Sequence, residues 1–342
     1  MELSPLKSLY AEGEAFATVY LEGRSPGEDA ADQIRLRWKS LRERLASDGA
    51  DQAALTVLDD ALARDKAGEE QANGRVLVAS DHGRLGLDAP WDASLGAGDD
   101  AGWGVLPQLG AYAREATHAA RVLLIVAGHE ETELRRLVVA RDLTESPDGP
   151  EDGAAEGSHN THAGEPAHRR IRRRAEDTTV QDGDALASAV SSALSRFTPD
   201  VVILAGEVQK RTSVREQLPG HLHDKVVETS RGGAPDAGAR EALDEEVLRI
   251  ATEHVEQRLQ DNASRLREAL GHQDAVQGDA QVLKAAETGA LETLFLEEET
   301  TAKRESLLLK EASRTGAVLA LVPHGTGLED GSAGILRFHP EG

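Results

Sequence analysis

Cysteine is absent from the 342-residue chain, and aromatic residues make up only 3% of it. Without cysteine there is no disulfide, no thiolate nucleophile and no cysteine-ligated zinc or iron–sulfur site. So few aromatic side chains argue against a stacking platform for single-stranded nucleic acid. No run approaches the roughly 20 apolar residues of a membrane-spanning helix, and the first ten residues lack the pattern of a signal peptide. We therefore expect a cytoplasmic protein with no membrane partner.

Basic residues are outnumbered: 38 Lys and Arg stand against 61 Asp and Glu, which gives a net charge of -23. A charge of this sign argues against broad, non-specific binding of nucleic acid, and we expect no DNA partner. Hydrophobic residues make up 39% of the chain, as in ordinary globular proteins. The length predicts two or three domains with sizeable cores.

The hydrophobic pattern predicts an α/β protein of three segments, residues 1–104, 105–262 and 263–342. In the first, a strand near residues 16–21, two amphipathic helices and a hairpin over 75–87 precede an aperiodic stretch, 88–103. In the second, apolar runs at 122–127 and 201–206 predict buried strands, with a helix over 184–197 and a long helix over about 239–270. In the third, helices over 282–288 and 303–313 alternate with strands over 291–296, 317–322 and 335–338.

The sharpest feature of the chain is a change of charge within the second segment. Residues 143–168 are polar and predict a mobile loop, with five acidic and no basic residues between Glu145 and Glu156. The loop ends in His168, after which five of the next six residues, 169–174, are arginine. Arginine suits bidentate contact with phosphate, so this run indicates contact with RNA. The alternative is a solvated helix start that pairs with the acidic loop.

Other kinds of site are weakly supported. His159, His162 and His168 lie in the predicted loop without a scaffold or third carboxylate ligand, so a metal site is disfavoured. The glycine-rich stretches lack the spacing of a nucleotide-binding loop, and no Gly-x-Ser-x-Gly nucleophile motif occurs. The pair Asp81–His82 and the residue Asp200 suit turn and cap roles better than acid–base catalysis. We expect no cofactor and no metal.

Four stretches in order resemble a known superfamily. They carry Ala-Gly after a strand and then Lys-Arg-Thr, a further strand and a glycine pair, an "LKA…GALETL" segment, and a "GA…G…GILRF" ending, at residues 201–212, 225–233, 282–294 and 316–338. Together they are similar to the archaeo-eukaryotic class-1 release factor superfamily, which contains Pelota. The greater similarity is to its bacterial branch, the group with the ribosome hibernation factor Balon and mycobacterial relatives. The resemblance covers about residues 106–338.

The resemblance implies a fold and a partner. The middle domain would be an RNase-H-like α/β layer, and the third an α-β-α sandwich like that of kink-turn-binding ribosomal proteins. The protein would act as a monomer in the ribosomal A site, with EF-Tu as the implied delivery partner. The basic run lies where family members meet ribosomal RNA, which implies RNA contact by His168, Arg169, Arg170, Arg172, Arg173 and Arg174.

Two departures from the family pattern bear on activity. The Gly-Gly-Gln motif that supports peptidyl-tRNA hydrolysis is absent, and Ala163, Gly164 and Glu165 stand at the corresponding place in the loop that would face the peptidyl-transferase centre. The Asn-Ile-Lys-Ser motif that reads stop codons is absent too. We therefore predict a non-catalytic factor that occupies the A site of idle ribosomes. The alternatives are a divergent release or rescue factor that uses Gly164 and Glu165, and a regulator that binds structured RNA or protein.

Overall fold

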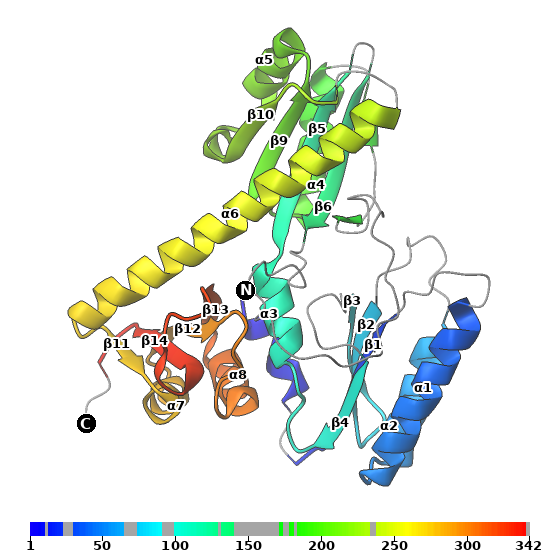
Figure 1. Ribbon diagram of the computed structural model, residues 1–342, viewed down its shortest axis with the longest axis vertical. Helices are drawn as coiled ribbons and strands as arrows, with labels where there is room; N and C mark the ends of the chain where they lie inside the picture. The colour runs from blue at the N-terminus through cyan, green and yellow to red at the C-terminus, as the bar shows by residue number, and fades with distance from the viewer. Residues whose placement is uncertain are drawn as a thin grey trace, which may run out of the picture. The chain divides into compact units, whose positions relative to one another are not determined.

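Three β-sheets with flanking helices follow one another along the chain, as the α/β prediction requires (Figure 1). The structure is a computed structural model that describes residues 1–10, 13–22, 30–64, 74–90, 99–128, 131–139, 171–173, 178–180, 183–232 and 237–339. The chain forms two compact units: residues 1–118 with 257–342, and residues 119–256. Within the described ranges, no helix combines the length and the apolar character needed to cross a bilayer.

The first sheet is an antiparallel four-stranded sheet covered on one face by two helices. Its strand order is β3 (Leu85–Pro90), β2 (Gly74–Ser80), β1 (Phe16–Glu22) and β4 (Asp100–Gly104). The covering helices are α1 (Ala30–Ser47) and α2 (Gln52–Ala63), and the Asp51 side chain caps α2 by accepting from the Ala53 N–H. Leu45 and Leu58 from the helices pack against Val19 and Leu77 of the sheet. β4 falls in the stretch predicted to be aperiodic, because Asp and Gly dominate its sequence.

A short helix, α3 (Gly110–His118), covers the opposite face of the first sheet (Figure 1). Ala111 and Tyr112 of the helix pack with Tyr20 of β1 and Val76 of β2. No helix was predicted in this segment.

The second sheet belongs to the unit of residues 119–256. Its order is β10 (Val226–Thr229), β9 (Val201–Gly206), β5 (Ala120–Ala127), β6 (Thr132–Val139) and β7 (Ile171–Arg173), and β8 (Thr178–Val180) also pairs with β6. β5, β9 and β10 are parallel, whereas β6 runs antiparallel to β5. The predicted strands at 122–127 and 201–206 are thus confirmed as the buried centre of a layer.

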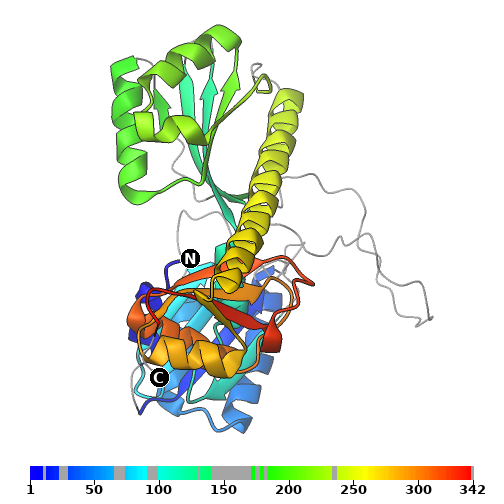
Figure 2. The same ribbon diagram turned by 90° about the vertical axis from the view of Figure 1, so that its left-hand side faces the viewer.

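Helices cover both faces of the second sheet (Figure 2). Leu186 and Val190 of α4 (Gly183–Arg196), Val214 of α5 (Val208–Gln217) and Leu222 of the 3-10 helix η4 (Gly220–Lys225) share a core with alternate residues of β5 and β9. The long helix α6 (Ala237–Gly271) contributes its buried stripe Leu243, Val247 and Ile250 to this unit.

The third sheet has the order β11 (Ala275–Gln277), β14 (Ser332–Leu336), β12 (Leu291–Glu297) and β13 (Val318–Val322). Leu266 from the last part of α6 packs on Phe295 and Ile335 of this sheet. α7 (Asp279–Glu287) and α8 (Glu305–Thr315) pack together, and the left-handed Gly316 ends α8 as the sequence predicts. The short 3-10 helix η5 (Glu329–Gly331) precedes β14.

The first residues of the chain lie against the third sheet. The Leu3 N–H donates to the Ala317 carbonyl and the Leu319 N–H donates to the Met1 carbonyl, so this segment extends the β13 edge. The 3-10 helix η1 (Ser4–Leu9) then packs on α8, with Leu6 and Leu9 buried. The first and third sheets therefore belong to one compact unit.

Candidate functional site

The predicted loop belongs to residues 140–170, which form an insertion in sequence between strands β6 and β7 of the second sheet. β6 ends at Val139 and β7 begins at Ile171, and these two residues are register partners in an antiparallel pair. The ends of the two strands that flank residues 140–170 in sequence therefore lie side by side. The next pairs along this ladder are Val138 with Arg172 and Leu137 with Arg173.

The structure describes the backbone of two of the predicted site residues. Arg172 and Arg173 lie in β7, so this part of the basic run is a strand and not the helix start considered above. The other predicted RNA-contacting residues and the predicted loop residues lie outside the described ranges: His168, Arg169, Arg170 and Arg174, and Ala163, Gly164 and Glu165.

A partly buried ion pair lies in the first half of β6, between Arg135 and Glu133. Arg135 is 6% exposed, and its Nε and Nη2 donate to Glu133 Oε1 and Oε2 over 2.6 and 2.7 Å. A bidentate carboxylate partner offsets the cost of burying the guanidinium charge. Sequence reasoning missed this pair. The signal was available, because residues two apart on a strand share one face.

A second polar group stands beside β9 and β10. The buried Arg211 of α5 donates from Nη1 to the Gly206 carbonyl over 3.1 Å, and its Nε lies 3.3 Å from Glu228 Oε2. Arg215, one turn further along α5, donates to Glu228 Oε1 over 2.9 Å. One carboxylate thus bridges two guanidinium groups and fixes α5 against the edge strand β10. These contacts give Arg211, the arginine of the Lys-Arg-Thr motif, a structural role.

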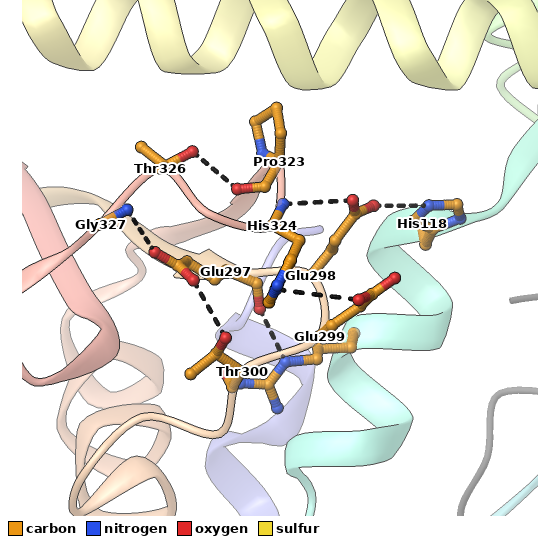
Figure 3. Close-up of polar contacts among 10 residues, drawn as sticks. His118, Glu297, Glu298, Glu299, Thr300, Pro323, His324, Thr326 and Gly327 are labelled. Carbon is orange, nitrogen blue, oxygen red and sulfur yellow. Dashed lines mark hydrogen bonds and ion pairs between the residues drawn. The ribbon is translucent and has the colours of Figure 1, made fainter. Parts of the chain in front are cut away.

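In the other unit, polar side chains gather where the parallel strands β12 and β13 end (Figure 3). The buried Glu297 carboxylate accepts from the Gly327 and Leu328 N–H groups over 2.8 and 3.0 Å and from the Thr300 hydroxyl over 3.0 Å. Burial alone would raise the pKa of Glu297, but these hydrogen bonds outweigh it and lower the pKa below its ordinary value. The predicted glycine-rich loop is therefore held to the sheet by a carboxylate.

The next residue, Glu298, joins this edge to α3. Its Oε2 lies 3.2 Å from Nε2 of the buried His118, and its Oε1 accepts from the His324 N–H over 3.3 Å. The His324 ring, which is 62% exposed, stands 3.8 Å from the Glu299 carboxylate. Figure 3 shows the three carboxylates and two imidazoles side by side. Nevertheless, in the part of the chain that the structure describes, no group of three or more suitable side chains could hold a metal ion.

The histidines considered as metal ligands, His159, His162 and His168, lie outside the described residues.

Comparison with known proteins identifies the type of the second unit. Residues 121–272 match the family model of bacterial archaeo-eukaryotic release factor family 2. This stretch, which is less than half of the chain, is similar to the archaeo-eukaryotic release factors of bacteria. The predicted superfamily and its bacterial branch are thereby confirmed, whereas the narrower placement among hibernation factors stays a prediction. No curated protein matches the chain.

Solved structures of this release factor superfamily match at low identity. Dom34 of S. cerevisiae is 13% identical over 67% of this chain and 65% of its own, with a TM-score of 0.42. Pelota of Archaeoglobus fulgidus is 14% identical over 78% and 80% of the two chains, with a TM-score of 0.31. A model of ribosome-bound archaeal Pelota and ABCE1 gives 14% identity over 99% and 94%, with a TM-score of 0.43. This chain thus spans slightly less than two thirds of yeast Dom34.

Proposed function

We propose that this release factor relative binds the ribosome and occupies the A site of idle ribosomes without hydrolysing peptidyl-tRNA. The observation that carries the proposal is a segment of release factor type, residues 121–272, in a chain without Gly-Gly-Gln. A glutamate in place of the motif's glutamine brings negative charge and removes an amide donor. Such a factor would block tRNA entry and protect the ribosome.

The basic run is the part of the chain that we assign to ribosomal RNA. Arg172 and Arg173 lie in the edge strand β7, and the remaining arginines of residues 169–174 flank this strand in sequence. Arginine forks bind backbone phosphates, which position a protein without reading sequence. The rest of the protein is strongly acidic, so non-specific RNA contact elsewhere is repelled. Binding would then depend on shape and on this run.

The test is co-sedimentation with vacant 70S ribosomes at low and moderate salt, with and without EF-Tu·GDP. We expect stoichiometric binding that persists at moderate salt, since a purely electrostatic contact weakens steeply as salt rises. The variant in which Arg169, Arg170, Arg172, Arg173 and Arg174 are all changed to Ala should lose binding. Binding by neither protein under any condition contradicts the ribosome proposal as a whole.

A matched variant separates the basic run from the overall charge. It removes five exposed cations elsewhere by changing Arg35, Lys39, Arg249, Arg265 and Lys303 to Ala. Each of these side chains is at least half exposed, and exposed ion pairs contribute little to stability. The control should bind as the unchanged protein does, and equal losses in the two variants would remove the basic run from the mechanism.

The second candidate is a divergent release factor in which Gly164 and Glu165 act on peptidyl-tRNA. It is favoured by the insertion's position, between paired strands of a release-factor-type segment. Programmed ribosomes carrying labelled peptidyl-tRNA decide between the two candidates. A release rate above background that falls in Glu165→Ala supports the enzyme, and a background rate in both proteins supports the non-catalytic factor.

A further inference from the structure

Helix α3 contacts two sheets through two groups of side chains. Within the unit of residues 1–118 and 257–342, Ala111 and Tyr112 pack on the first sheet, whereas Arg114 and His118 reach the loops of the third. A helix of nine residues has little stability of its own. Its conformation must therefore come from these two sets of contacts.

On the side of the first sheet, two hydroxyl groups of β1 form hydrogen bonds with the backbone at the start of α3. The Tyr20 hydroxyl donates to the Gln108 carbonyl over 2.6 Å and accepts from the Tyr112 N–H over 3.3 Å. The Gln108 N–H donates to Thr18 Oγ1 over 3.0 Å. Burial raises the pKa of the Tyr20 phenol, so the hydroxyl stays protonated and can donate. These contacts fix the start of α3 to the central strand of the first sheet.

On the side of the third sheet, Arg114 binds three parts of one loop. Its Nη1 and Nη2 donate to Glu305 Oε1 and Oε2 over 2.6 and 2.5 Å. The same guanidinium donates to the Glu297 carbonyl over 3.0 Å and to the Thr300 carbonyl over 2.6 Å. Arg114 and Glu305 side chains are 13% and 7% exposed. A buried arginine with this many acceptors defines the shape of the loop from 297 to 305.

His118, one turn after Arg114, is the last residue before the chain enters the other unit, and Gln257 is the first after its return. Its imidazole meets Glu298, and Arg258 Nη2 donates to the Thr117 and His118 carbonyls over 2.7 and 3.3 Å. Both crossing points of the chain are thus tied to the same place in this unit.

The chain start provides a second, independent connection between the same sheets. Residues 1–3 extend the β13 edge, and η1 packs on both α8 and β3. Arg84, which precedes β3, donates to the Ser8 carbonyl and to Glu14.

We infer that α3 and the chain start fasten the first and third sheets into one rigid, cooperatively folding body, with Arg114 as the residue that couples them. The loops at the carboxyl ends of β12 and β13 keep their shape only while α3 is docked. A partner bound to either sheet is therefore bound to a body that includes the other. The inference concerns this unit alone and does not depend on ribosome binding.

Distances between spin labels test the rigid body directly. Because the chain has no cysteine, Lys39→Cys on α1 and Lys284→Cys on α7 give a single labelled pair at exposed positions. Double electron–electron resonance on the full-length protein should give one narrow distance distribution. A broad or two-peaked distribution overturns the inference, whatever the behaviour of any other variant.

Hydrogen exchange tests the role of Arg114. In Arg114→Met, amides of residues 298–304 and 324–328 should exchange at least about tenfold faster, while those of β14 stay protected. Arg265→Ala, which removes an exposed pair with Glu292 in the same unit, should change neither set. If Arg114→Met does not fold, Arg114→Lys keeps the charge, loses the fork and should show the same pattern more weakly. Faster exchange confined to α3 would contradict the coupling.

Discussion

Arg114 of α3 and Glu305 of α8 form a bidentate ion pair, with Nη1–Oε1 and Nη2–Oε2 distances of 2.6 and 2.5 Å, between segments 191 residues apart in sequence. Both side chains are largely buried. Removing one partner of a buried pair leaves the other charge desolvated, so Arg114→Met should lower the free energy of unfolding by about 3–5 kcal/mol. Urea unfolding followed by circular dichroism measures the loss.

The double variant Arg114→Met with Glu305→Leu separates the pair from its surroundings. Because it leaves no unpaired charge, its loss should be smaller than the sum of the single losses by about 1–3 kcal/mol. Additive losses would mean that the two charges act independently and that the geometry of the pair has no energetic consequence.

Glu115, the neighbour of Arg114 on α3, predicts a dependence of stability on pH. Glu115 is 3% exposed, and burial raises its pKa to about 9. The folded state therefore holds a proton between pH 4.5 and 9 that the unfolded chain releases. The free energy of unfolding falls as pH rises through this window, because the folded state binds more protons.

Glu115→Gln removes this titration, since the amide is neutral at every pH. The variant should be more stable than the unchanged protein by about 1–3 kcal/mol at pH 8–9 and nearly equal to it at pH 4. Urea unfolding at pH 4, 7 and 9 gives the comparison. Glu43→Gln, at an exposed position on α1, should show no such trend, and parallel curves for the two variants would contradict the burial argument.

Much of the fold could be predicted from apolar periodicity, and the exceptions have physical causes. The β5 and β9 cores, α6 and the glycine-capped α8 carry strong patterns because each buries a full face or stripe. β4 and α3 escaped prediction because Gly, Asp and Ala supply little periodic signal there. They form because neighbouring elements cover them.

The candidate sites can likewise be divided into those that a local sequence pattern predicts and those that it does not. A run such as residues 169–174 is visible in sequence because its chemistry is local, and β7 confirms only that two of its arginines lie in a strand. Arg114, His118, Glu298 and Glu305 lie far apart in sequence and carry no motif. Their association depends on how α3 packs between two sheets, and single-sequence patterns hold no information about that packing.

Gly206, at the end of β9, should not accept a larger residue without a loss of stability. Its φ is +108°, and a Cβ built there would lie 2.3 Å from the Ala127 carbonyl oxygen. Gly206→Ala should therefore lower the free energy of unfolding by about 2–4 kcal/mol, from backbone strain together with displacement of β5. Gly220 provides the control, because a Cβ there meets no atom within 4 Å. Gly220→Ala should change stability by less than about 0.5 kcal/mol, and similar losses in thermal or urea unfolding would refute the steric reading.

The Glu297 carboxylate should hold the loop of residues 325–328 to the sheet, and this stabilisation should be lost in acid. Its pKa is lowered because backbone N–H groups and the Thr300 hydroxyl, bound to the charged form, outweigh burial. The stabilisation is present above the ordinary glutamate pKa near 4.5 and is lost as pH falls through the lower folded value.

Glu297→Gln can keep Oε1 as the acceptor for the Gly327 and Leu328 N–H groups, but it removes the negative charge and puts an amide donor where Oε2 accepts from the Thr300 hydroxyl. Because hydrogen bonds to a charged group are the stronger ones, the variant should cost about 1–3 kcal/mol at pH 7. Between pH 5 and 3, the unchanged protein should lose more stability than Glu297→Gln does, because only the carboxylate can take up the proton. The Gly327 and Leu328 amides should exchange faster in the variant. Glu292→Gln, at a surface pair with Arg265, should leave both amides unchanged, since it does not touch the loop. Equal acid sensitivity in Glu297→Gln and the unchanged protein would show that other carboxylates account for acid unfolding.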